Sequence, residues 1–425
     1  MTRRRGVVGG LFLLGIGIAP VPAGGQAAPR DSVATDVCTS CHAALPVERL
    51  SAPVTKYRDD VHAGLGFGCV ECHGGDLSAA GFATMDPRKG FLGRPSGRQV
   101  LQVCGRCHSD AGFMRRYNPA TRVDQVTEYG ASVHGQRLLG MGDTKVATCI
   151  NCHPAHQIRP PDDSRSSVHP ANVATTCGAC HADSTHMDGY EIPTDQLEQY
   201  RASVHWQALS ERGDLSAPTC NDCHGNHGAA PPGVAWVGNV CGQCHSVMEA
   251  GFAGSRHALV FARMGVPGCA VCHGNHAVGA TADSLLGMGE GAVCARCHVE
   301  GQGGGVTAAA MRRAIDSLRA AFTVADSLLR RAEHAGMEVS QAQFELQNAQ
   351  TALLQARTAI HTFATDSVDR HVDEGLAVTD TAIARGNEAL ADLRFRRLGL
   401  GLSTGVIVLL IGALVLKIWQ LERGA

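Results

Sequence analysis

The chain has 425 residues and a formal net charge of −2, with 18 Cys and 51 Gly but only 3 Trp, 5 Tyr and 11 Phe. This charge argues against nucleic-acid binding through a basic surface, and the regular spacing of Cys and His argues against disorder. Because large side chains are scarce, something else is expected to fill the interior.

Residues 1–28 have the pattern of a secretory signal peptide. Three arginines at positions 3–5 precede an apolar run over 7–21, and small residues follow as far as Ala28. A membrane anchor is the alternative, but the run is short and rich in Gly. The sequence therefore predicts export from the cytoplasm, with cleavage near Ala28.

Residues 29–305 contain nine CxxC pairs, and a His directly follows each pair. Two thiols at this spacing reach both vinyl groups of one porphyrin and the next imidazole lies under the iron, as in covalent haem c attachment. Disulfides and zinc ribbons also use paired Cys, but neither requires a His after every pair. We expect nine haem c groups, whose porphyrins supply the missing apolar volume. The expected thioether residues are Cys38, Cys41, Cys69, Cys72, Cys104, Cys107, Cys149, Cys152, Cys177, Cys180, Cys220, Cys223, Cys241, Cys244, Cys269, Cys272, Cys294 and Cys297. The expected proximal iron ligands are His42, His73, His108, His153, His181, His224, His245, His273 and His298.

The motifs form four repeats. Each complete repeat reads Ser-x-His, CxxCH-x-x-His and a second CxxCH, and such repeats begin at His134, His205 and His257. A weaker first repeat begins at His62 and has Gly-Gly-Asp after its first motif, with the Asp where the second spare His would be. The motif at Cys38 stands alone before it and completes the nine.

Nine further His lie in 29–305, which is enough to give each iron a second imidazole. A His three residues after a proximal ligand cannot reach the far face of its own porphyrin, so we expect it to ligate a neighbouring haem. His169 and His186 fit the repeats least well, and an ordinary structural role is their alternative. The candidate distal ligands are His62, His134, His156, His169, His186, His205, His227, His257 and His276, with His361 from the later part of the chain.

After a Gly-rich segment, 301–305, that is expected to be a hinge, the composition changes to that of a helical stalk over 306–397. Apolar residues at spacings of 3 and 4, such as Ile315, Leu318 and Phe322, predict three long helices that form a hairpin and a stalk. His361 lies near a helix end and is expected either to ligate the first haem or one of the weak repeat, or to be an ordinary polar residue. An intrachain bundle is favoured over dimerisation, although a homo-oligomer through these seams stays open.

Residues 398–419 are predicted to cross a membrane, and 420–425 to form a cytoplasmic tail. No charged residue lies from Leu398 to Leu416, and a helix of that length spans about 28 Å. The flanking basic residues mildly favour the opposite orientation, but long exported domains translocate regardless of such charges. A buried apolar helix in a soluble protein is the alternative.

The stretches Ser132-Val-His-Gly, Thr148-Cys-Ile-Asn-Cys-His-Pro-Ala-His and Thr176-Cys-Gly-Ala-Cys-His resemble the doubled-CxxCH multihaem cytochromes c. The resemblance covers about 36–300 and implies an exported electron carrier. Pentahaem nitrite reductases carry a CxxCK motif that this chain lacks, and tetrahaem quinol dehydrogenases have an N-terminal membrane helix. Neither activity is therefore implied.

The expected fold class is a haem-packed, mostly irregular and α-helical multihaem cytochrome domain, followed by an α-helical hairpin or stalk and one C-terminal transmembrane helix. We expect it in the cytoplasmic membrane with its haems on the periplasmic side. It would carry electrons between a quinol-oxidising membrane complex or periplasmic donor and a further cytochrome or terminal reductase. No catalytic residue and no nucleic-acid partner is predicted. The alternatives are a multihaem oxidoreductase with one open haem, acting on a small nitrogen or sulfur compound, and direct quinol oxidation by a haem near the bilayer.

Overall fold

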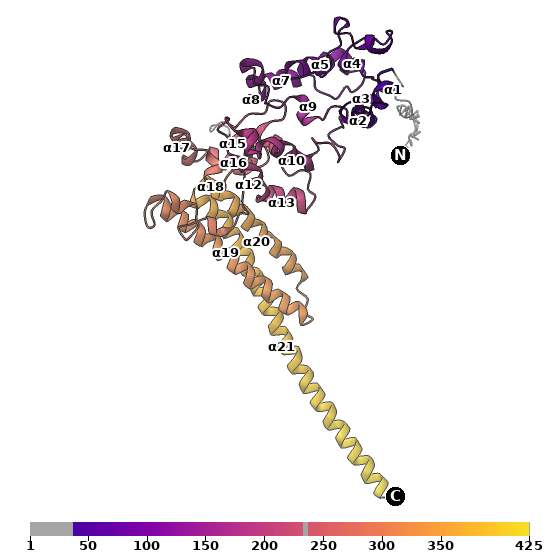
Figure 1. Ribbon diagram of the computed structural model, residues 1–425. Helices are drawn as coiled ribbons and strands as arrows, with labels where there is room; N and C mark the ends of the chain where they lie inside the picture. Colours follow the sequence, from indigo (N-terminus) through magenta and orange to yellow (C-terminus); the bar gives the residue numbers. More distant parts are fainter. Residues whose placement is uncertain (1–36, 233–236, 425) are drawn as a thin grey trace, which may run out of the picture. The chain divides into compact units, whose positions relative to one another are not determined.

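The computed structural model describes residues 37–232 and 237–424, which contain helices and loops but no β-strand (Figure 1). The expected signal peptide, 1–28, lies outside the described residues. The described chain divides into a first part, 37–104 with 153–160, and a second part, 105–152 with 161–424. The elements of the first part are α1 (Val37–Ala43), α2 (Glu48–Tyr57), α3 (Val61–Gly64), α4 (Val70–His73), η1 (Gly81–Met85) and η2 (Pro87–Lys89), and α5 (Arg98–His108) runs from the first part into the second.

In the first part, the distant segment 153–160 is joined to the start of α3. The Asp60 side chain caps α3 by accepting from the His62 backbone N–H at 3.0 Å. Its second oxygen accepts from the Ile158 N–H at 2.8 Å, and the Ile158 carbonyl accepts from the Val61 N–H at 2.9 Å. A capping carboxylate that is only 4% exposed thus joins two segments far apart in sequence.

Between 105 and 302 the second part consists of short helices linked by loops. Its small core contains Leu138, Val173 and Leu209, which are each at most 8% exposed. The elements are α6 (Ala111–Met114), α7 (Gln125–Ala131), α8 (Val133–Gln136), η3 (Arg137–Met141), α9 (Cys149–Cys152), α10 (Pro170–His181), α11 (Ser184–Met187), α12 (Gln196–Arg201), α13 (Val204–Glu211), α14 (Cys220–His224), α15 (Val237–Gly242), α16 (Ser246–Ala253), α17 (Arg256–Met264), α18 (Gly268–His273), η5 (Asp283–Leu285) and η6 (Cys294–Arg296).

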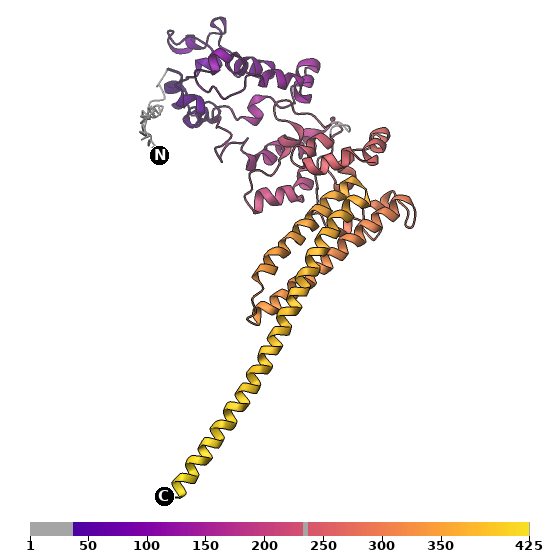
Figure 2. The ribbon, with the colours of Figure 1, turned by 180° about the vertical axis from the view of Figure 1, so that it is seen from behind.

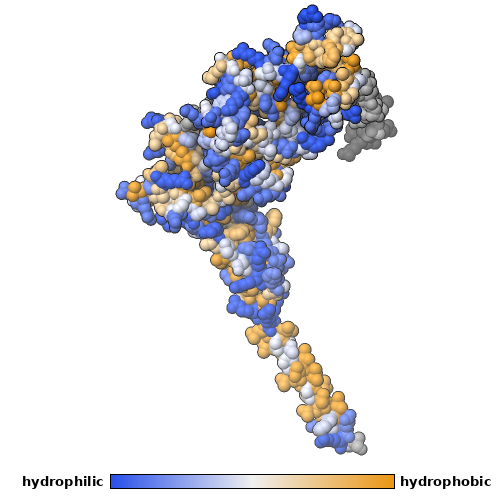
Figure 3. Space-filling view, viewed as in Figure 1, coloured by the Kyte–Doolittle hydropathy of each residue, from blue (hydrophilic) through white to orange (hydrophobic). Residues whose placement is uncertain are grey.

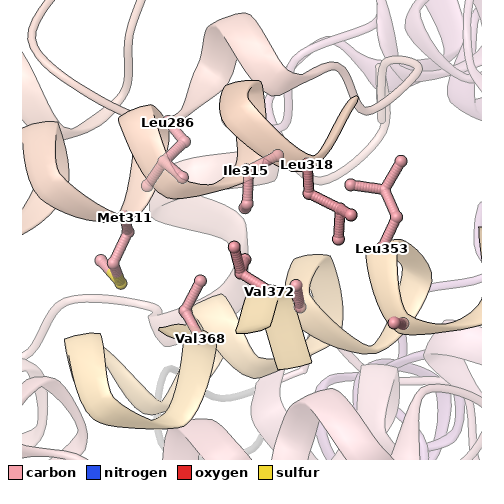
Figure 4. Packing of buried hydrophobic residues seen from close by; sticks show 9 residues of the cluster. Leu286, Met311, Ile315, Leu318, Leu353, Val368 and Val372 are labelled. Carbon is pink, nitrogen blue, oxygen red and sulfur yellow. The ribbon is translucent and has the colours of Figure 1, made fainter. Parts of the chain in front are cut away.

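Three long helices follow and pack side by side as a bundle: α19 (Gly303–His334), α20 (Ser340–Ala359) and α21 (Thr365–Arg423) (Figures 1 and 2). The short η7 (Ile360–Thr362) joins α20 to α21. The helical seams expected from the spacing are confirmed, because Ile315 and Leu318 are fully buried and pack with Val368 and Val372 of α21 (Figure 4). The bundle is therefore formed within one chain.

Glycines allow neighbouring segments of the bundle region to pack closely against one another. A Cβ at Gly375 of α21 would lie 2.7 Å from both Leu318 methyl carbons, so the small residue lets α21 approach α19. The expected hinge at 301–305 is not observed, since α19 already begins at Gly303. A Cβ at Gly305 would lie 2.2 Å from the Val299 carbonyl oxygen, so this glycine serves close packing.

The helix α21 has 59 residues and continues without a break from the bundle into the apolar segment. It is the one helix of the described residues long and apolar enough to cross a membrane, and its apolar window is fully unburied within the chain. Figure 3 shows this end of the helix as hydrophobic surface. The alternative of a buried core helix is therefore wrong, and the expected boundary at 397/398 falls inside a continuous helix.

An ion-pair cluster fixes the fourth repeat to the bundle. The Asp283 carboxylate accepts two 2.8 Å hydrogen bonds from the Arg357 guanidinium of α20. On α19, Arg312 donates to the Asp283 carbonyl oxygen at 2.6 Å, and Arg319 lies 3.7 Å from the carboxylate. The Asp283 side chain is only 12% exposed, so solvent screens these contacts weakly.

Replacing Asp283 with Asn should destabilise the folded chain by about 1–3 kcal/mol, because the guanidinium of Arg357 loses a charged partner. The hydrogen bond from Arg357 lowers the pKa of the Asp283 carboxyl. This carboxyl therefore stabilises the fold above its unfolded pKa of about 4, and the contribution is lost as the pH falls below that value. Chemical unfolding of the detergent-solubilised chain, followed by circular dichroism, measures both effects.

Asp326→Asn is the matched control, since Asp326 pairs with Arg330 on the exposed face of α19. Its loss should cost less than about 0.5 kcal/mol. Equal losses in the two variants, or an unchanged acid dependence in Asp283→Asn, would contradict the importance of the buried cluster.

Candidate haem-binding sites

Local helical structure gives the motifs their shape. In the first motif of each repeat the residues lie in a short helix, such as α4, α9, α14 or α18. In a helix, residues i, i+3 and i+4 share a face, which places both thiols and the imidazole on one side. No disulfide joins the cysteines that the structure describes. The described chain also contains no group of three or more His, Cys, Asp or Glu side chains that could hold a metal ion, as a zinc ribbon would require.

Six motif histidines each face one spare histidine across a similar gap. Every pair joins a motif His with a spare His, and the ring centroids are 5.8–6.5 Å apart. The pairs and their centroid distances are His73–His156, 5.8 Å; His134–His181, 6.0 Å; His205–His245, 6.5 Å; His224–His276, 6.0 Å; His257–His298, 5.9 Å; and His273–His361, 6.1 Å.

This separation fits an iron between the two rings. An imidazole nitrogen lies about 2 Å from the metal that it ligates, so two rings on opposite sides of one iron have centroids about 6 Å apart. Unliganded imidazoles that stack directly would be closer than this. The residues present thus fit the two axial ligands of a haem, with the porphyrin supplying the other four nitrogens.

The pairs follow a register that differs from the expected one. The His of each complete Ser-x-His pairs with the second motif His of its own repeat, as in His134–His181. The His that follows a first motif pairs instead with the first motif His of the preceding repeat, as in His156–His73 and His276–His224. We expected each of these His to ligate a neighbouring haem, but not a haem held by another repeat. The repeats are therefore not self-contained, because successive repeats exchange histidines.

The two classes of pair also differ in ring angle. First-motif pairs are close to parallel, with interplanar angles of 10° for His73–His156, 16° for His224–His276 and 25° for His273–His361. The second-motif pairs are tilted by 36° to 74°. First-motif and second-motif pairs therefore have different angles between their imidazole planes.

His361 pairs with His273 of the fourth repeat, and not with the first haem or the weak repeat as expected. No further repeat follows the fourth, and η7 of the bundle takes its place in supplying the partner. The His361 Nδ1 donates to the Thr358 carbonyl at 3.0 Å, and the His361 backbone lies against Gly251 of α16. The next aromatic residue, Phe363, has a positive φ of 54° and lies 3.8 Å from the His257 ring, measured between centroids.

Backbone carbonyls orient several of the paired rings. The Nδ1 of His73 lies 2.6 Å from the Gly93 oxygen, and that of His224 lies 3.2 Å from the Ala230 oxygen. An Nδ1–H that donates to a carbonyl leaves Nε2 unprotonated, which is the form that binds a metal. The rings are thus prepared for ligation through Nε2.

Burial also keeps many of the paired imidazoles neutral. It lowers their pKa because the protonated ring loses hydration, and a neighbouring imidazole is the next cause. A neutral ring has the free lone pair that ligation requires. The histidines concerned are His134, His156, His181, His205, His257, His273 and His276.

Sequence reasoning missed an aromatic residue five positions before the His that opens each of the four repeats: Tyr57, Tyr129, Tyr200 and Phe252. The Tyr129 hydroxyl donates to Ala147 and that of Tyr200 to Pro218, in each case the carbonyl two residues before the first Cys of the repeat. Tyr57 does the same with Phe67. The recurring spacing was the signal that could have revealed this role.

The Ser of Ser-x-His is a helix N-cap. Ser132 accepts from the Gly135 N–H at 2.9 Å, and Ser203 accepts from the Trp206 N–H at 3.1 Å. Both serines are fully buried, so the cap fixes the start of the helix that carries the spare His. The pattern is therefore structural and positions the spare His at the start of its helix.

The remaining spare histidines are placed differently. His169 caps α10 through its Nδ1, which accepts from the Ala171 N–H at 3.3 Å, and His186 lies near His181. Neither faces another imidazole at the pair distance in 37–232 and 237–424. His62 bonds to Asp60 at 2.9 Å and His227 lies 3.9 Å from Glu128; their ligand roles stay predictions.

Thiols of successive motifs meet in the second part. The Cys177 side chain interacts with that of Cys220, and the Cys241 side chain interacts with that of Cys269. Burial, and next the charge of Cys241, raises the pKa of the Cys223 thiol to about 11. Cysteines of consecutive CxxCH motifs are therefore neighbours in the second part.

Comparison of the chain with protein-family models, with curated proteins and with solved structures gives no match.

Proposed function

We propose that this chain is a membrane-tethered cytochrome c with nine covalent haems. It resides in the cytoplasmic membrane by its C-terminal helix, with the haem domain on the periplasmic side. It carries electrons between a quinol-oxidising membrane complex or periplasmic donor and a further cytochrome or terminal reductase. The six pairs of motif and spare imidazoles, each at the spacing of two axial iron ligands, carry the proposal.

The chain's residues favour electron carriage over catalysis at these six sites. When bound, haem supplies one-electron chemistry at its iron. Paired imidazoles would occupy both axial positions, which excludes substrate and water and leaves outer-sphere electron transfer. The thiol contacts of the second part bring successive attachment points together, which a path for electrons requires.

The purified, detergent-solubilised chain should contain nine haems by pyridine haemochrome assay. Its oxidised form should show two classes of low-spin electron paramagnetic resonance signal, because near-parallel and tilted imidazole planes split the iron d orbitals differently. At least six irons should be low-spin, one for each pair. A haem-free chain, or one in which most irons are high-spin, would refute the proposed function.

A matched pair of variants tests the motif assignment. Cys220→Ala with Cys223→Ala should lower the haem content from nine to eight, because both thioether positions of one motif are lost. Thr219→Ala with Ser216→Ala, which alters polar residues beside the same motif, should leave nine. An unchanged count in the Cys variant would show that this motif holds no haem.

A further inference from the structure

The regular pairing of motif and spare histidines leaves one motif histidine, His42, without a partner imidazole. Each second motif takes its partner from a Ser-x-His earlier in its own repeat, as His181 takes His134. The lone motif of Cys38, Cys41 and His42 directly precedes the first repeat, which is the place of a second motif. Among the described residues no Ser-x-His stands before His42, so the register seen in the later repeats offers it no imidazole.

The irregularity of the first repeat has the same origin. Three residues after a first-motif His, the later repeats have a His that serves the first motif of the repeat before. The first repeat has Asp76 there, and no first motif stands before this repeat among the described residues. Asp76 is instead paired with Lys89 and accepts from the Ser78 N–H at 2.9 Å. The first repeat thus lacks the second spare His, and it also lacks a preceding first motif whose haem that His would ligate.

The backbone holds Asp76 in this other role. Gly75 has a positive φ of 102°, and a Cβ there would lie 2.4 Å from the Thr84 carbonyl oxygen. That same carbonyl accepts from the Asp76 N–H at 3.0 Å. The turn therefore directs the Asp76 carboxylate to Lys89 and Ser78. Because the carboxylate is engaged there, it does not take the place of the second spare His.

The contacts of His42 are consistent with an imidazole that has no second imidazole opposite it. All 21 histidines of the sequence lie within the described residues, and none of them faces His42 at the distance seen in the six pairs. The His42 Nδ1 lies 3.3 Å from the Leu50 carbonyl oxygen, the same kind of contact that orients His73 and His224. His42 is therefore prepared as a proximal ligand through Nε2, but without a second imidazole.

We propose that the haem of the lone motif keeps one axial position open and binds small ligands that attach to iron through carbon or nitrogen, such as carbon monoxide in the ferrous state and cyanide in the ferric state. This rests on the proposed function, because it requires haem at the motif. Six of the other motifs face a spare imidazole, and His62 and His227 are the predicted ligands of two more, so the lone motif is the one for which the described chain offers none.

The reduced, solubilised full chain is titrated with carbon monoxide while haem content is measured in parallel. Nine haems with one carbon monoxide bound per chain is the expected result, and the oxidised chain should show one high-spin iron that cyanide converts to low-spin. Nine haems with no ligand binding would overturn the inference alone, since another side chain would then close the site. A chain without haem would refute the proposed function itself.

Two double variants locate the site. Cys38→Ala with Cys41→Ala should leave eight haems and abolish carbon monoxide binding. The matched control, Cys177→Ala with Cys180→Ala, should also leave eight haems but retain one bound carbon monoxide, because it removes a closed pair, His134–His181. Binding that persists in the first variant and disappears in the second would place the open iron elsewhere and overturn the inference.

Discussion

Replacing His361 with Ala should add one high-spin iron to the holoprotein without changing its haem content. His361 lies 6.1 Å from His273 between ring centroids, and its ring is oriented by the Nδ1 hydrogen bond to the Thr358 carbonyl. Because the thioether cysteines are untouched, the haem would stay attached while its iron loses one axial ligand. Carbon monoxide bound per chain should therefore rise by one.

Two further variants make this prediction specific. His334→Ala removes an exposed histidine from the end of α19 and should change neither spin state nor ligand binding. His361→Met should restore a low-spin iron with a raised reduction potential, because a thioether ligand favours the ferrous state relative to imidazole. If His361→Ala leaves every low-spin signal in place, His361 is not an axial ligand.

Truncating the chain after Arg397 should move it almost entirely from the membrane fraction to the soluble fraction. The removed part of α21 is apolar and unburied, with Leu409 75% and Leu416 63% exposed, so nothing in the described chain covers it. A helix of this length can fill the hydrocarbon core of a bilayer. Fractionation without detergent, followed by haem staining, measures the change.

Truncation after Trp419 is the control, since it removes only the last six residues and keeps the apolar segment. That chain should remain in the membrane fraction and carry the same number of haems. If the chain that ends at Arg397 also stays in the membrane, another segment anchors it, and the assignment of α21 as the anchor fails.

Periodicity was enough to predict the bundle. The spacing of Ile315, Leu318 and Phe322 reflects which side of a helix must be covered, and this depends on neighbours along one helix. The start of the same region was predicted less well. Gly304 and Gly305 indicated a hinge, but glycine also permits close packing, and a Cβ at Gly304 would lie 2.4 Å from the His298 ring. Sequence alone does not distinguish these two uses of glycine.

The candidate site was predicted at the level of residues but not of partners. The CxxCH motifs are local, because one helical turn carries both thiols and the imidazole. The pairing of His276 with His224, and of His361 with His273, joins segments separated by 52 and 88 residues. No local pattern specifies which of many equivalent histidines meet, so the exchange between repeats and the role of η7 emerge only from the three-dimensional structure.

The exchange of histidines between successive repeats implies an order of maturation. With haem bound as proposed, a first-motif iron stays incompletely ligated as its repeat is exported, until the following segment has emerged and folded against it. The last such iron, at His273, waits for η7, which lies just before the membrane helix. A chain interrupted during export would therefore retain a reactive, ligand-accessible iron at its most recent repeat, and only a chain exported as far as the bundle would be fully protected along this series.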